Sequence, residues 1–294
     1  MPKIDIPIKR LVARRSTDWL RFICPEADPA KTRPFKAEKT PKVQSRLDEV
    51  FIVDGPEGQY IIHFEAQGYH DKAFPARMLR YRADIWESTM SAGQGAPHIE
   101  QTAVFFFPDH ENKPHGLQDD GIDYEYRVVR LWEVPRAAVI DKSLIGLYPL
   151  LPLMQDEAGE TPDAVLEQAV AKIAGATEDM ALQHDLMAVL GIMGGEKYGA
   201  ELVQRYIRRE MLMQSQVYQE WIKEDIREAE AKERAKTLRE DILEVLFERF
   251  DVVKKSLMEK INAIDDVSVL KALLKKSAKA DSIEEFERFL DGVV

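Results

Sequence analysis

The stretch RLDEVFIVDGPEGQYIIHFEAQGYHDKAFPARMLRYRADIW, from Arg46 to Trp86, decides the fold of this chain. Two runs rich in β-branched and aromatic residues, 47–54 and 59–67, flank the turn sequence GPEG, which predicts a β-hairpin. The segment 74–86 follows directly and predicts a helix, because Pro75 suits a first helical turn. The hairpin and the helix together indicate a sheet with a helix packed on it.

The flanking sequence extends this core. A basic helix with an apolar stripe is expected over 8–23, and the segment 24–42, with four prolines and several basic residues, predicts an extended loop. The runs AVFFF (103–107) and YEYRVVRLWEV (124–134) predict two further strands. The resulting order, αββαββ, indicates an α/β fold with a mixed sheet flanked by helices.

The character of the sequence changes after Pro135. Helices are predicted over 162–174, 177–193 and 199–213, and a long solvated helix over 223–241, where 13 of 19 residues are charged. From 242 onward a strong helical period is broken near Asp251, Asp265 and Asp281, which predicts a small bundle of three or four helices. We therefore predict a core over 1–155, a helical extension over 156–222, a charged linker helix over 223–241 and a small all-α C-terminal domain over 242–294.

Composition sets limits on the class of protein. The longest apolar stretch, SLIGLYPLLPLM (143–154), has 12 residues and contains two prolines, so it is too short to cross a bilayer, and no membrane partner is expected. Cys24 is the single cysteine, so no intrachain disulfide can form, and Cys24 is best explained by packing. The start of the chain does not look like a signal peptide, so a cytoplasmic location is expected.

Charge is distributed unevenly along the chain. The net charge is −11, yet residues 1–46 hold 12 Lys and Arg against 5 Asp and Glu. An acidic protein does not bind nucleic acid over its whole surface. Any surface that contacts phosphate should therefore involve the first segment.

The hairpin carries the strongest set of candidate functional residues. Side chains two apart on a strand share a face, so His63, Glu65 and Gln67 should line one side of the sheet, with Asp48 on the neighbouring strand. Two carboxylates that meet across a hairpin are hard oxygen ligands of the kind Mg²⁺ uses. The alternative is that Asp48 and Glu65 are solvated at a strand end and neutralised by Arg77 or Arg80 on the following helix.

The quoted stretch resembles the PD-(D/E)XK nuclease-like transposase family, also called Rpn or YhgA-like recombination-promoting nucleases. The pattern is an Asp opening a strand, then H-x-E-x-Q ending the next strand, then a helix with R-M-x-x-Y. The matching positions are Asp48, His63, Glu65, Gln67, Asp71, Arg77, Met78 and Tyr81. The resemblance continues through LWEVP (131–135), GLYPLLPLM (146–154), IRREMLMQSQVYQEW (207–221) and a helical tail like a domain of unknown function often fused to these proteins.

The resemblance implies a restriction-endonuclease-like core in which Asp48 and Glu65 hold Mg²⁺, with Mn²⁺ as a substitute. It also implies that the third motif position orients water. That position is usually Lys in the superfamily and is Gln67 here, and a neutral amide can only donate and accept hydrogen bonds. The family places a further acid in the first helix, which matches Asp18, although Asp18 could instead cap the start of a helix.

The remaining motif residues have a supporting role in this interpretation. Arg77 and Tyr81 lie four apart on one helical face, where they could contact the DNA backbone or brace the carboxylates, and bracing is the simpler role for Arg77. His63 points to the Glu65 face, although a histidine bonded to a backbone carbonyl is the more ordinary arrangement.

Three functions follow as hypotheses. The first is an Mg²⁺-dependent DNA endonuclease, a phosphodiester hydrolase that acts in recombination or transposition. The second is a catalytically inactive nuclease-like fold that binds DNA or a protein. The third is an oligomerisation protein built on the helices after Thr161, and the C-terminal helices could in any case join a second copy or a protein partner.

Overall fold

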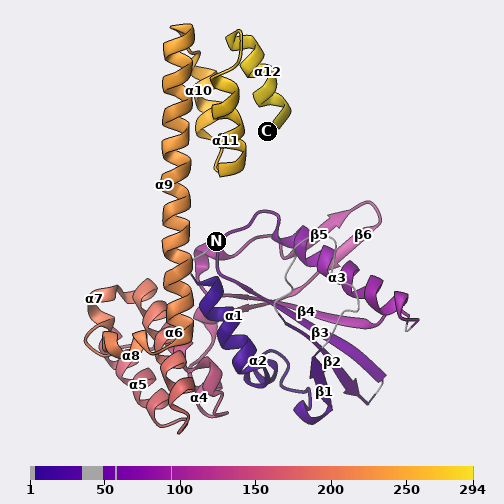
Figure 1. Ribbon diagram of the computed structural model, residues 1–294. Coiled ribbons are helices and arrows are strands. Elements are labelled where there is room, and N and C mark those ends of the chain that lie inside the picture. The colour runs from indigo at the N-terminus through magenta and orange to yellow at the C-terminus, as the bar shows by residue number, and fades with distance from the viewer. Residues whose placement is uncertain (1–3, 35–48, 57, 94, 294) are drawn as a thin grey trace. The chain divides into compact units, whose positions relative to one another are not determined.

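The computed structural model describes residues 4–34, 49–56, 58–93 and 95–293, and it is a mixed α/β structure followed by a helical C-terminal region. Its main sheet has five strands in the order β1-β2-β3-β4-β7. The strands are β1 (Thr32–Pro34), β2 (Glu49–Gly55), β3 (Gly58–Gln67), β4 (His98–Phe105) and β7 (Arg127–Arg130). Figure 1 shows this sheet together with the helices that flank it.

The predicted hairpin and its helix are confirmed. β2 pairs antiparallel with β3 in a register that sets Val53 opposite Tyr60 and Glu49 opposite Phe64. The chain then forms α3 (Phe74–Ser91), with Pro75 in its first turn, and returns as β4, which pairs parallel with β3. Because β7 also runs parallel to β4, the sheet is mixed, as predicted.

Two strand predictions need correction. β4 begins at His98, five residues before the predicted start. Its first residues are mostly polar, so they lack the run of apolar residues from which the strand was predicted. The predicted strand 124–134 is divided between β6 (Ile122–Glu125), β7 and the 3-10 helix η3 (Leu131–Glu133). β6 pairs with β5 (Gly116–Asp119) in a separate two-stranded sheet that turns at Gly121, whose φ of 80° favours glycine.

Each face of the main sheet packs against different helices. Ile62, Phe64 and Val104 belong to the large core that includes the helices of the N-terminal segment, and Trp19 stacks on Phe64 with ring centroids 5.9 Å apart. The side chains at alternate positions, such as Ile61, pack toward α3. The alternation predicted from sequence therefore places the face of His63, Glu65 and Gln67 beneath α3.

The basic helix predicted over 8–23 is two helices, α1 (Asp5–Arg14) and α2 (Ser16–Ile23). Arg15 leaves the helical conformation, with φ −133° and ψ 39°, and its backbone N–H donates to the carbonyls of Leu11 and Val12. The helical spacing of the apolar residues continues across this break. The spacing alone therefore could not show that the segment forms two helices. In the predicted loop, the described residues contain the 3-10 helix η1 (Pro29–Lys31) and the short strand β1.

A helical region completes the first part of the chain. Its elements are α4 (Ala137–Ile140), the 3-10 segment η4 (Ile145–Leu153), α5 (Pro162–Ala174), α6 (Met180–Tyr198), α7 (Ala200–Val203) and α8 (Arg209–Met213). The 3-10 helix η2 (Pro108–His110) precedes this region. The predicted helix 162–174 is confirmed as α5. The predicted helix 177–193 begins later because Asp179 caps α6, and the predicted helix 199–213 is divided into α7 and α8.

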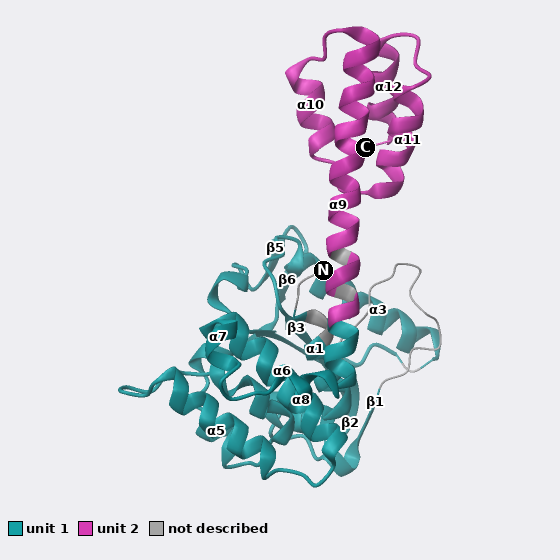
Figure 2. Ribbon diagram, turned by 60° about the vertical axis from the view of Figure 1, so that its left-hand side comes forward, with its two compact units in different colours: residues 1–221 teal, residues 222–294 magenta. Residues whose placement is uncertain are grey.

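The chain divides into two compact units, Met1–Trp221 and Ile222–Val294, coloured separately in Figure 2. The boundary lies one residue before the predicted start of the linker helix. The predicted extension 156–222 shares its core with the sheet, since Ile8, Phe64 and Leu186 belong to one cluster. The predicted linker helix is part of α9 (Gln216–Phe250), which continues past 241.

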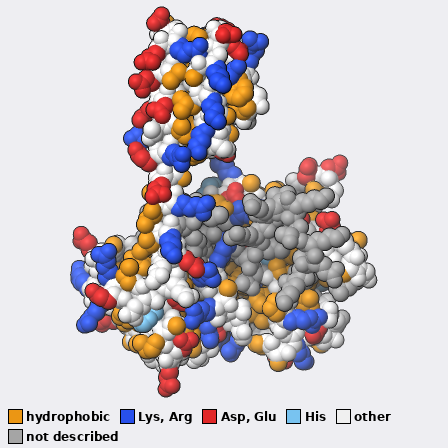
Figure 3. All heavy atoms as spheres, viewed as in Figure 1, with side chains coloured by type: hydrophobic (Ala, Val, Ile, Leu, Met, Phe, Trp, Pro, Cys, Tyr) orange, Lys and Arg blue, Asp and Glu red, His pale blue; other side chains and the backbone are white. Residues whose placement is uncertain are grey.

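The second unit is a small helical bundle, as predicted. α10 (Lys255–Asn262), α11 (Val267–Ser277) and α12 (Ile283–Val293) pack with the end of α9 around Ile242, Leu246 and Phe286. Figure 3 shows acidic and basic side chains interspersed on the visible face of this unit. In the described part of the chain, no helix combines the length and the apolar character that crossing a membrane requires.

Candidate functional site

The polar side chains at the end of β3 are buried beneath α3. His63 is 0% exposed, Glu65 4% and Gln67 1%. Asp48, the predicted second carboxylate, lies outside the described residues, directly before Glu49 in the sequence. An ionised carboxylate in such a position is costly unless hydrogen bonds or a cation compensate for lost hydration. The interpretation of Glu65 as a solvated strand-end residue is therefore wrong.

Glu65 is paired with His63. The Nε2 atom of His63 lies 3.0 Å from Oε1 of Glu65, and both groups are enclosed by the sheet and α3. The other ring nitrogen of His63, Nδ1, lies 3.0 Å from Nε2 of Gln101 on β4. The histidine therefore bonds two side chains, in place of the backbone carbonyl that was the ordinary expectation.

Buried Gln67 and partly buried Arg77 form a second polar group. The amide Oε1 of Gln67 accepts a hydrogen bond of 2.7 Å from Arg77, and its Nε2 donates to the carbonyl of Tyr69. Arg77 also forms an ion pair with Asp71 and donates to the Tyr69 hydroxyl at 3.1 Å. Arg77 thus braces Gln67 and the residues that follow β3, and the carboxylate it pairs with is Asp71.

Tyr81, the last residue of the motif, is buried one turn further along α3. Its ring meets the His63 ring edge to face, with centroids 5.6 Å apart and an interplanar angle of 86°. The Tyr81 side chain is 4% exposed, so its observed position is a packing position against His63. A direct contact with DNA would require the helix to move.

Asp18 connects α2 to η4. Its carboxylate oxygen Oδ2 accepts hydrogen bonds of 2.8 Å from Nε of Arg15 and from the backbone N–H of Gly146. A side chain at position 146 would collide with Arg15, so glycine allows this close approach. The residue preceding α2 is Arg15 and no side chain caps that helix, so the helix-cap interpretation of Asp18 is wrong.

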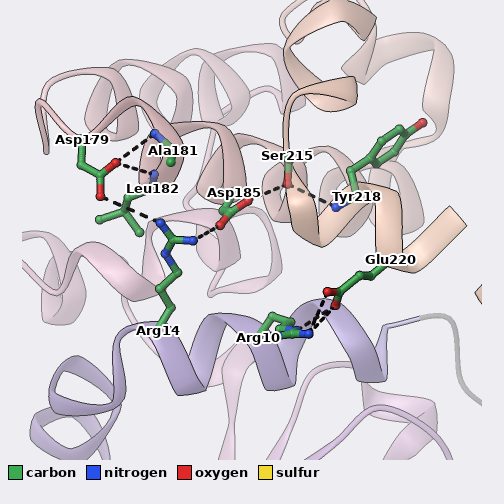
Figure 4. Close-up of polar contacts among 9 residues, drawn as sticks. All are labelled: Arg10, Arg14, Asp179, Ala181, Leu182, Asp185, Ser215, Tyr218 and Glu220. Atoms are coloured by element: carbon green, nitrogen blue, oxygen red, sulfur yellow. Dashed lines mark hydrogen bonds and ion pairs between the residues drawn. The ribbon is translucent and has the colours of Figure 1, made fainter. Parts of the chain in front are cut away.

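Several arginines of the basic N-terminal segment pair with acids of the same unit. Arg14 lies 2.5 Å from Asp185 of α6, and Asp185 also accepts a hydrogen bond of 2.8 Å from Ser215. Arg10 donates two hydrogen bonds to the carboxylate of Glu220 near the start of α9 (Figure 4). These internal pairs neutralise part of the charge that was expected to face phosphate.

A group of potential metal ligands lies elsewhere in the first unit. Sγ of Cys24 and carboxylate oxygens of Glu26 and Glu100 all lie within 4.8 Å of one another, the one such group of three or more in the described residues. Burial, with the nearby carboxylates, raises the pKa of Cys24 to about 12. A thiol suits softer metals than Mg²⁺, so this group differs from the predicted magnesium site.

Carboxylates line part of two cavities in the described residues. A cavity of about 400 Å³ follows the ends of β3 and β4, where Gly68, Tyr69, Asp109, His110 and Glu196 line it. A larger cavity of about 600 Å³ lies in the second unit, far in sequence from the β3 residues, and its wall mixes basic and acidic side chains: Lys232, Lys236 and Arg239 with Glu233, Glu240 and Asp265. Since carboxylates repel phosphate, the first wall is no basic groove, and in the second wall the acidic side chains balance the basic ones.

Sequence reasoning missed Gln101 and Tyr124. Gln101 is 5% exposed in the middle of β4 and contacts His63, and the Tyr124 hydroxyl lies 2.9 Å from its Oε1. A polar residue at the fourth position of a strand that ends in AVF was a signal that could have identified Gln101. Tyr124 belongs to a hairpin that the sequence did not indicate, so its contact could not be anticipated.

Comparison of the chain with protein-family models, with curated proteins and with solved structures finds no match.

Proposed function

We propose that this chain is an Mg²⁺-dependent DNA endonuclease with a restriction-endonuclease-like core, acting in recombination or transposition in the cytoplasm. The observation that supports the proposal is Glu65, a carboxylate buried at the end of β3 and oriented by His63. The sequence resemblance to recombination-promoting nucleases assigns the same residue to metal binding. The mixed sheet flanked by helices is the coarse architecture that this resemblance implies.

The donor chemistry of Glu65 fits Mg²⁺, because a carboxylate oxygen is a hard ligand. The proposal assigns the second carboxylate to Asp48, which lies outside the described residues. When bound, Mg²⁺ would activate water and shield the charge on the scissile phosphate. Mn²⁺, which prefers the same ligands, should replace it.

Gln67 has a more limited role in this proposal than a lysine would have. One N–H of its amide is used by the Tyr69 carbonyl and its oxygen by Arg77. An amide carries a second N–H, which could orient water, but it carries no positive charge. We therefore assign Gln67 to orienting water and Arg77 to holding the amide in place.

The alternative function is a nuclease-like fold that binds DNA or a protein without cutting it. The absence of a charge at Gln67 favours this alternative, as does the internal pairing of Arg10 and Arg14. In that case the helices of the second unit would supply a surface for a protein partner or a second copy. Binding would then saturate without any metal-dependent change in the DNA.

The test is the conversion of supercoiled plasmid to nicked or linear DNA by the full chain with Mg²⁺, Mn²⁺ or EDTA. We expect metal-dependent cleavage by the wild type, loss of cleavage in Glu65→Gln and Asp48→Asn, and retention in Asp54→Asn. Asp54 is a matched control because it is an exposed carboxylate on the same hairpin, paired with Arg33. Full cleavage by Glu65→Gln would refute the assignment, and saturable binding without cleavage by the wild type would support the alternative.

A further inference from the structure

Gln101 has a fixed amide orientation, which its neighbours determine. Its Oε1 faces two groups that donate, the guanidinium of Arg82 at 3.2 Å and the hydroxyl of Tyr124 at 2.9 Å. Its Nε2 faces the backbone carbonyl of Met78 at 3.0 Å, which can only accept. The reverse orientation would set the NH₂ group against a guanidinium and the amide oxygen against a carbonyl, so it is excluded.

This orientation determines which nitrogen of His63 carries the proton. One N–H of the Gln101 amide is donated to Met78, and the other points at Nδ1 of His63, 3.0 Å away. Nδ1 must therefore accept, which leaves the ring proton on Nε2. That nitrogen lies 3.0 Å from Oε1 of Glu65, so His63 donates to the Glu65 carboxylate.

We propose that Gln101, held by Arg82 and Tyr124, is a positioning residue that fixes His63 as an Nε2–H donor and thereby orients the Glu65 carboxylate. This inference deepens the proposed nuclease function and rests on it for the role of Glu65 as a metal ligand. His63 is then a positioning residue as well. Its Nδ1 is occupied by Gln101 and its Nε2 by Glu65, so neither nitrogen serves as a metal ligand or a general base.

The burial of His63 and its partners supports a rigid chain of hydrogen bonds. His63, Gln101 and Tyr124 are all less than one-tenth exposed, and the ring edge contact with Tyr81 holds the imidazole on a third side. Burial raises the pKa of Tyr124, which keeps its hydroxyl available as a donor. A buried hydrogen-bond network of this kind is rigid when every donor and acceptor in it has a partner.

The first test reads the tautomer directly in the full chain without metal or DNA. Long-range ¹H–¹⁵N spectra of protein labelled at histidine nitrogen, with the His63 signals assigned by their loss in His63→Asn, should show a proton on Nε2 and a bare Nδ1. Gln101→Glu, which replaces the donor with an acceptor, should place a proton on Nδ1. Tyr124→Phe should leave the wild-type pattern, because Arg82 still orients the amide. A proton on Nδ1 in the wild type would overturn the assignment.

The second test measures Mn²⁺ affinity in the same variants. We expect Gln101→Glu to weaken Mn²⁺ binding about tenfold, the lower end of the effect of disturbing a partner bonded directly to a metal ligand, because Gln101 acts on Glu65 through His63. Glu87→Gln, an exposed change on α3, should leave it unchanged. Equal affinity in the wild type and Gln101→Glu would overturn the positioning role. A wild type with the expected tautomer that binds no Mn²⁺ would refute the proposed function and the positioning role, while the hydrogen-bond directions would stand.

Discussion

Replacing Asp18 with alanine should destabilise the first unit through the loss of one buried and one partly buried hydrogen bond. Oδ2 of Asp18 accepts from Arg15 and from the N–H of Gly146, each at 2.8 Å, in a side chain that is 4% exposed. A hydrogen bond to a charged group contributes about 1.5–3 kcal/mol, and the Gly146 N–H would be left unsatisfied. We expect the free energy of unfolding to fall by about 3–5 kcal/mol.

The assay is urea unfolding followed by tryptophan fluorescence. The four tryptophans, Trp19, Trp86, Trp132 and Trp221, all belong to the first unit, so the signal reports that unit. Asp18→Asn retains an acceptor for Gly146 and should cost about half as much, and the exposed control Asp141→Ala should change stability by less than about 0.5 kcal/mol. A loss below about 1 kcal/mol for Asp18→Ala, combined with abolished DNA cleavage, would refute the structural role and support the catalytic role that the resemblance implies for Asp18.

Three further predictions concern other parts of the chain. Cys24, buried and with a pKa raised to about 12, should react with iodoacetamide at pH 8 far more slowly in the folded protein than in urea; equal rates would contradict its burial. Phe286→Ala should destabilise the second unit by about 3–5 kcal/mol in circular dichroism melts without moving the tryptophan transition. Hydrogen bonding to Arg130 lowers the pKa of Glu111, so this pair stabilises the fold above pH 4.5 and loses its effect as the pH falls through the lowered pKa. Arg130→Met should therefore be less stable than the wild type at pH 7, and this difference should shrink as the pH falls below 4.5 and through the lowered pKa; a constant difference in stability would contradict this linkage.

The parts of the fold that the sequence predicted are those governed by local signals. The alternating apolar residues around GPEG predicted the hairpin, and Pro75 predicted the start of α3. Helix α5 has the predicted bounds because Thr161 caps it and Pro162 opens it. The break at Arg15 and the division of 124–134 depend on contacts with distant segments, which no local period reports.

The candidate site was predicted in part for the same reason. Strand alternation placed His63, Glu65 and Gln67 on one face, and the structure buries that face beneath α3. The hydrogen bond at Nδ1 of His63 depends on Gln101, which lies 38 residues further along the chain than His63. Sequence spacing identified the group of residues, and tertiary packing determined its hydrogen bonds.

The most direct test of the central claim is to count the Mn²⁺ ions bound by the full chain, using the electron paramagnetic resonance signal of free Mn²⁺. We predict one ion for each wild-type chain, competed by Mg²⁺, and none for Glu65→Gln at the same concentrations. Asp54→Asn should bind as the wild type does. Equal binding by the wild type and Glu65→Gln would contradict the assignment of Glu65 as the metal carboxylate.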